Sequence, residues 1–128
     1  MERKLNDRLE IVEHKGQTIL FADYTGLNQA EFVKQVKQNK GDIVSYGQQS
    51  GEKSLLLLSD ISNTLLTEEV QEAFKELVPA IDPYIKAAAI VGMTGFKRYA
   101  LAILNKVVSV SRRTFDTVDE AKDWLVTQ

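Results

Sequence analysis

A short turn in the last third of the chain carries the residues best suited to bind an anion. Gly92-Met93-Thr94-Gly95 follows a predicted strand over 86–91 and precedes a predicted helix over 96–110. Free backbone amides at a helix start, with Lys97 and Arg98 in the first turn, can hold a negatively charged group. Loops at the carboxyl ends of parallel strands are also the usual ligand sites of α/β proteins. The alternative is that the two glycines only make a tight turn, because the spacing of a Walker phosphate loop is absent.

The predicted helix over 96–110 is amphipathic, and its polar side carries basic residues and no acid. A wide apolar face with basic flanks suits an anionic lipid or another anionic amphiphile, whereas the alternative is an ordinary core helix. Lys97 and Arg98 lie at the helix end where the dipole disfavours cations, so a nearby anion would explain them. The candidate ligand-binding residues are therefore Thr94, Gly95, Phe96, Lys97, Arg98 and Tyr99, and the candidate membrane-facing residue is Lys106.

Three further polar residues, Asp23, Asp60 and Ser62, lie at the ends of predicted strands and could converge. The chain has a single histidine, so a serine hydrolase is not expected. Two aspartates could hold a magnesium ion, but their separation does not follow from the sequence. We favour Asx-type capping of the loops at these positions. The one histidine, His14, is expected to be a solvated residue of a hairpin turn.

Composition excludes several classes of chemistry. The 128 residues include no cysteine, which excludes disulfides, thiolate metal sites and cysteine nucleophiles. We therefore expect no enzyme, no metal and no cofactor. The net charge of −2 hides an acidic middle, with two basic and seven acidic residues over 44–85, and a stretch over 86–115 that has six basic residues and no acid. A pI near 5.4 argues against a nucleic-acid footprint.

The longest apolar runs are Leu55–Leu58 and Ala87–Val91, far shorter than a signal peptide core or a membrane span requires. We expect a cytoplasmic protein that can associate peripherally with the inner face of the membrane.

The hydrophobic patterning predicts an α/β protein. We expect a mixed, mostly parallel sheet of about five strands, flanked by about four helices, in one domain over 1–128. The four consecutive leucines 55–58 indicate a strand buried on both faces. The predicted elements are a hairpin over 9–14 and 18–23, a helix over 28–39, a strand over 54–59, a helix over 67–81, a strand over 86–91, a helix over 96–110, a strand over 113–115 and a helix over 117–128. The glycines over 47–51 are expected to lie in a loop.

Four segments resemble the SpoIIAA-like branch of the STAS domains. They read GQTILFADYTGL over 16–27, LSDISNT over 58–64, PYIKAAAIVGMTG over 83–95 and RTFD over 113–116. Their order and spacing match over roughly 9–126, and together they are fairly specific. The resemblance implies helices that flank a mixed sheet, a fold also similar to the CRAL-TRIO lipid-transfer domains. It further implies binding of a ligand in an apolar pocket and membrane association through the helix over 96–110.

The anti-sigma-factor antagonists of this family carry a phosphorylatable serine in an Asp-Ser-Ser-Gly turn before the second helix. The corresponding stretch here, Leu65–Glu69, has no serine and no glycine, and Thr67 is expected to cap the helix instead. The resemblance thus supports the fold and argues against the phosphorylation switch.

Two functional hypotheses follow from the sequence. The first is a non-enzymatic module that binds an anionic amphiphile, either a lipid or a fatty acid. The second is a STAS-type regulatory module that binds a protein, and that could form a homodimer, through the acidic helix over 67–81 or the basic helix over 96–110.

Overall fold

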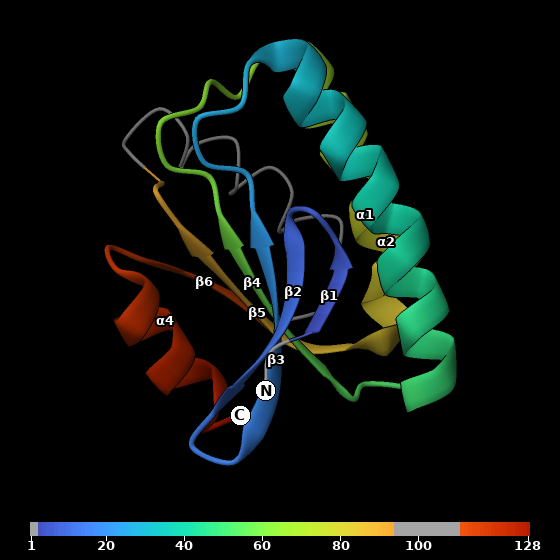
Figure 1. The fold of residues 1–128 in the computed structure, drawn as a ribbon, viewed down its shortest axis with the longest axis vertical. Helices are drawn as coiled ribbons and strands as arrows, with labels where there is room; N and C mark the ends of the chain where they lie inside the picture. The colour runs from blue at the N-terminus through green and yellow to red at the C-terminus, as the bar shows by residue number, and fades with distance from the viewer. Residues whose placement is uncertain (1–2, 94–110) are drawn as a thin grey trace.

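The computed structural model describes residues 3–93 and 111–128, which form a six-stranded sheet with helices on both faces (Figure 1). The elements in chain order are β1 (Arg3–Asn6), β2 (Leu9–His14), β3 (Gln17–Asp23), α1 (Gln29–Ser50), β4 (Leu55–Asp60), α2 (Glu68–Ile81), the 3₁₀ turn η1 (Asp82–Tyr84), β5 (Ile85–Val91), β6 (Ser111–Phe115) and α4 (Val118–Leu125). The predicted α/β class and mixed sheet are confirmed. The predicted helix over 96–110 lies outside the described residues.

The strands are ordered as they occur in the chain, from β1 at one edge to β6 at the other. Strands β1, β2 and β3 pair antiparallel, and β3 to β6 pair parallel. The expectation of about five strands is one short, because the residues of β1 were not predicted to form a strand. This four-residue edge strand consists mostly of exposed or half-buried polar residues, so it carries no apolar alternation.

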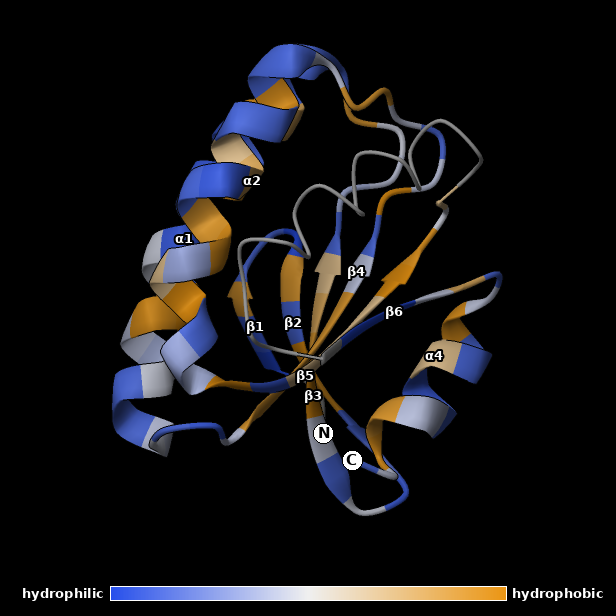
Figure 2. Cartoon of the chain, turned by 180° about the vertical axis from the view of Figure 1, so that it is seen from behind, coloured by the Kyte–Doolittle hydropathy of each residue, from blue (hydrophilic) through white to orange (hydrophobic). Residues whose placement is uncertain are grey.

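Helices α1 and α2 cover one face of the sheet, and α4 lies on the opposite face (Figure 1). Strand β4 is buried between these layers, as its leucine run predicts. Leu55 and Leu57 pack into the core beneath α1 and α2, and Leu56 and Leu58 pack into the core beneath α4. In Figure 2 the apolar sides of the helices face the sheet and the polar sides face outward.

Helix α1 is much longer than predicted. Its start is as expected, because Asn28 and Glu31 form a capping box. The expected helix end near Asn39 and the expected loop over 47–51 are both wrong. Buried positions recur every three or four residues through the segment, at Phe32, Val36, Asn39, Ile43 and Gly47. Burial of this stripe outweighs the low helix propensity of its glycines.

Asn39 is a fully buried polar residue in α1, and its side chain is hydrogen-bonded at both ends. Its Nδ2 donates to the buried Tyr24 hydroxyl at 2.9 Å, and its Oδ1 accepts from Asn6 at 3.0 Å and Gln35 at 2.8 Å. Burial raises the pKa of Tyr24 well above its ordinary value. Asn6 belongs to β1, so these bonds join the unpredicted edge strand to α1.

His14 is tied to α4, and the expectation of a solvated turn residue is corrected. Its Nε2 lies 2.7 Å from Asp123 Oδ1, and Lys15 Nζ lies 3.0 Å from the same oxygen. The His14 side chain is 24% exposed. Hydrogen bonds from His14 and then Lys15 hold the pKa of Asp123 below its ordinary value. This contact connects the tip of the β2–β3 hairpin to the C-terminal helix.

Substitution of the two glycines in α1 by alanine should have opposite effects on stability. A Cβ at Gly47 would lie 2.4 Å from Cγ of Tyr84, whereas a Cβ at Gly41 would meet nothing within 4 Å. We expect Gly47→Ala to lower the free energy of unfolding by about 1–3 kcal/mol through overpacking. Gly41→Ala, at an exposed helical site, should raise it by about 0.5–1 kcal/mol. Urea unfolding of both variants measures this, and equal effects would contradict the close packing of α1 against Tyr84.

The titration of Asp123 provides a second prediction. Because its pKa is lowered in the folded protein, its contribution to stability is complete above the ordinary carboxyl value of about 4. That contribution disappears as the pH falls through the lowered value. In a carboxyl NMR titration, His14→Ala should raise the Asp123 midpoint toward about 4. The distant Lys75→Gln serves as control, and an unmoved midpoint in His14→Ala would show that the hydrogen bond is not formed in solution.

Candidate functional site

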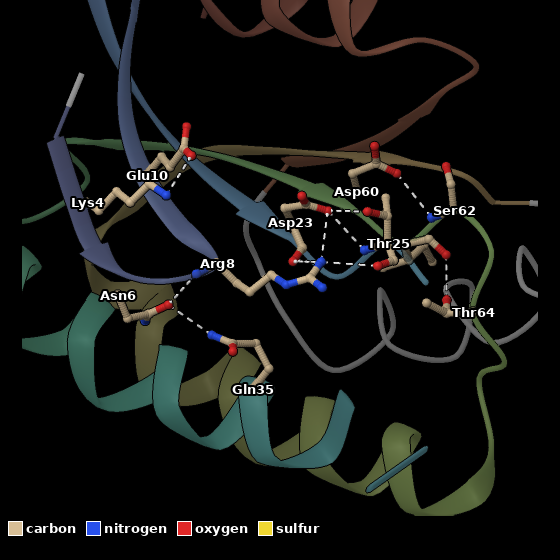
Figure 3. A network of polar contacts seen from close by, with 11 residues as sticks. Lys4, Asn6, Arg8, Glu10, Asp23, Thr25, Gln35, Asp60, Ser62 and Thr64 are labelled. Atoms are coloured by element: carbon tan, nitrogen blue, oxygen red, sulfur yellow. Dashed lines mark hydrogen bonds and ion pairs between the residues drawn. The ribbon is translucent and has the colours of Figure 1, made fainter. Parts of the chain in front are cut away.

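The carboxyl ends of β3 and β4 bring Asp23, Asp60 and Ser62 together, as expected from parallel pairing (Figure 3). Asp23 Oδ1 accepts hydrogen bonds from the Thr25 amide at 2.9 Å and the Thr25 hydroxyl at 2.6 Å. Asp60 Oδ1 accepts from the Ser62 amide at 3.0 Å. Both aspartates therefore form Asx turns, which confirms the favoured interpretation.

These carboxylates are engaged in holding the loops. Arg8 Nη1 donates to the Thr25 carbonyl at 3.1 Å and lies 3.7 Å from Asp23 Oδ1 (Figure 3). Within residues 3–93 and 111–128, no group of three or more His, Cys, Asp or Glu side chains could hold a metal ion.

Of the predicted anion-binding turn over 92–95, the structure describes Gly92 and Met93. The φ of Gly92 is +92°, and a Cβ there would lie 2.5 Å from the backbone nitrogen of Ser62. A glycine is therefore required for both backbone conformation and close contact with the β4–α2 loop. The candidate ligand residues Thr94, Gly95, Phe96, Lys97, Arg98 and Tyr99, and the candidate membrane-facing Lys106, lie outside the described residues.

An apolar pocket of about 60 Å³ lies between α2 and the face of β4 and β5. Ser59, Gln71 and Arg112 are its polar lining residues. Its apolar lining consists of Leu57, Ile61, Leu66, Phe74, Leu77, Val78, Ile81, Ala88, Ile90 and Met93. A single water needs roughly 10–15 Å³ by this measure, so the pocket has room for a short hydrocarbon chain.

Arg112 is the charged residue of this pocket, and its side chain is only 5% exposed. Its Nη2 lies 2.5 Å from Asp82 Oδ1 in η1. Its Nη1 is buried, and no residue of the described ranges accepts a hydrogen bond from it. In the sequence Arg112 is recognisable only as part of the basic stretch over 86–115, so this site was not predicted. The one available signal was an arginine next to a short predicted strand, which does not reveal burial.

A second feature is a surface groove between the β3–α1 and β4–α2 loops, which lie side by side at one end of the sheet (Figure 1). Its lining is Leu27, Asn28, Gln29, Asn63, Thr64, Leu65 and Thr67. The Leu65 side chain is 77% exposed. Glu68 and Glu69 follow in the first turn of α2, which Thr67 caps by accepting from the Val70 amide, as predicted.

None of the described helices is long and apolar enough to cross a membrane. No protein-family model and no curated protein matches this sequence.

The solved structures similar to this chain include the following two. One is an uncharacterised protein of the DUF3478 family with a SpoIIAA-like fold from Shewanella loihica, with a TM-score of 0.70, 18% identity and 91% of each chain covered. The other is an anti-sigma-factor antagonist (STAS) domain protein from Planctomyces limnophilus, with a TM-score of 0.58 and 13% identity. The match covers 92% of this chain and 97% of that chain. The chain therefore has the SpoIIAA-like fold of the STAS domains, as the resemblance implied.

Proposed function

We propose that this protein is a non-enzymatic regulatory module that binds a protein partner through the groove beside Leu65. The exposure of Leu65 carries this proposal. Among residues 3–93 and 111–128, Leu65 is the one large apolar side chain that is exposed, and it lines a groove between two loops, where a partner would cover it. The fold likeness to an anti-sigma-factor antagonist domain is in keeping with this class of function.

The loop that presents Leu65 is held by hydrogen bonds on both sides. The Thr64 hydroxyl donates to the Ile61 carbonyl at 2.5 Å, and Gln71 Nε2 donates to the Leu66 carbonyl at 2.9 Å. The Gly26 amide donates to the Ser62 carbonyl at 3.2 Å and so joins the two loops that form the groove. An apolar side chain on a preorganised loop can bind a partner without a large entropic cost of ordering.

The charge beside the groove indicates what kind of partner would fit. Glu68 and Glu69 follow Leu65 along the chain, in the first turn of α2, and the middle third of the chain is acidic overall. A partner with an apolar pocket and a basic rim would complement this surface. The absence of serine from Leu65–Glu69 means that the binding would not depend on serine phosphorylation at this turn.

Binding of an anionic amphiphile through Thr94–Tyr99, with peripheral membrane association, stays a prediction of the sequence. Vesicle co-sedimentation tests it. We expect anionic vesicles to retain the protein better than neutral ones, and the double variant Lys97→Glu, Arg98→Glu to remove that difference. Equal partitioning of the unmodified protein to both kinds of vesicle would contradict it.

Substitution of Leu65 tests the proposed interaction surface. Immobilised protein should retain a saturable protein partner from an extract of the organism that encodes it. Leu65→Asp should weaken that binding by about tenfold or more, as expected for an apolar anchor. The thermal midpoint should change little because the side chain is exposed.

Lys75→Glu provides the control, because Lys75 is exposed on α2, the helix that follows the Leu65 loop, and does not line the groove. It should leave partner binding unchanged. Absence of a saturable partner, or unaltered binding by Leu65→Asp, would contradict the proposal.

A further inference from the structure

The pocket between α2 and the sheet contains a buried hydrogen-bond donor, Arg112 Nη1, that finds no acceptor among the described residues. Arg112 lies on β6 beside Ala88 of β5, so its side chain lies on the face covered by α2. Burial of a charged donor without an acceptor costs about as much as a lost hydrogen bond. Native proteins leave few such groups unpaired, and an acceptor supplied by a bound molecule is one explanation for such a group.

The charge of Arg112 is already balanced. Asp82 accepts from Nη2 at 2.5 Å and is itself nearly buried, with a side chain 13% exposed. A second anion at Nη1 would place an unbalanced negative charge in a largely apolar pocket, which is unfavourable. A neutral acceptor, such as a carbonyl or amide oxygen, satisfies Nη1 without that penalty.

The rest of the pocket is suited to a short apolar chain. Leucine, isoleucine, valine, phenylalanine and methionine side chains form most of its wall, and Ala88 leaves space on the floor. The position of Arg112 among these residues supplies one polar contact that would orient a ligand.

We propose that this pocket binds a small neutral amphiphile, whose single acceptor oxygen receives a hydrogen bond from Arg112 Nη1 and whose short apolar chain lies against Leu57, Phe74 and Ile90. The site shares no lining residue with the groove beside Leu65. It also differs in chemistry from the anion site predicted over Thr94–Tyr99, because its ligand is uncharged.

Three five-carbon probes distinguish the chemistry. Pentanamide offers a neutral acceptor, pentanoate offers a charged one, and pentylammonium offers donors only. We expect pentanamide to cause saturable NMR shifts of the Leu57, Ile90 and Met93 methyl groups and of the Arg112 guanidinium. Pentylammonium should not saturate these sites, and pentanoate should bind more weakly than pentanamide.

A variant removes the donor while keeping the charge balanced. Replacing Arg112 alone would leave Asp82 buried and unpaired, so the test uses the double variant Arg112→Met, Asp82→Asn. It should weaken pentanamide binding by about tenfold. Arg113→Met is the matched control, because Arg113 is the exposed neighbour on the same strand, with its guanidinium over the Phe115 ring. It should bind pentanamide as the unmodified protein does.

A variant that fills the pocket keeps the proposal testable if the double variant does not fold. Ala88→Leu should abolish the pentanamide shifts, and Leu65→Asp should leave them unchanged even if it abolishes partner binding. Three results would overturn the proposal: pentylammonium shifts the same methyl groups as strongly as pentanamide, pentanoate binds more tightly than pentanamide, or no probe saturates the pocket methyl groups.

Discussion

The central strand β4 has to be covered on both faces, and this requirement organises the rest of the structure. Its four leucines alternate between two cores, one beneath α1 and α2 and one beneath α4. A strand buried in this way needs a paired neighbour on each side, which β3 and β5 provide in parallel register. Parallel pairing in turn aligns the carboxyl ends of these strands at one edge, where the loops with Asp23 and Asp60 meet.

The small residues of β5 set how closely the helical layer fills the space above the sheet. Ala88 pairs with Leu57 on one side and with Arg112 on the other. Because alanine is short, the space above it beside α2 remains as a pocket. Two buried polar side chains on this side of the sheet differ in how fully they are hydrogen-bonded. Asn39 has partners for both ends of its amide. Within the described residues, Arg112 has an acceptor for only one of its terminal nitrogens.

Much of the fold could be predicted because its signals are local. Asn28, Thr67 and Thr117 cap helices as predicted. Each cap could be predicted because it needs only a side chain and a backbone amide three residues further on. The errors arose where distant residues decide the outcome. Gly47 lies in the helix where Tyr84, far along the chain, packs closely against it. Strand β1 pairs with β2 and is joined by Asn6 to Asn39, and neither contact leaves a pattern in its own four residues.

Local sequence patterns were enough to predict the α/β class, the doubly buried strand and the Asx turns at the ends of β3 and β4. Hydrophobic periodicity and side chain to backbone hydrogen bonds act over a few residues. The length of α1, the exposure of Leu65 and the burial of Arg112 depend instead on packing between distant segments. Whether a side chain is covered depends on which residues pack against it, and those residues come from elements far apart in the chain. An arginine on a strand is identical in sequence whether it reaches solvent or lies in an apolar pocket beside Asp82.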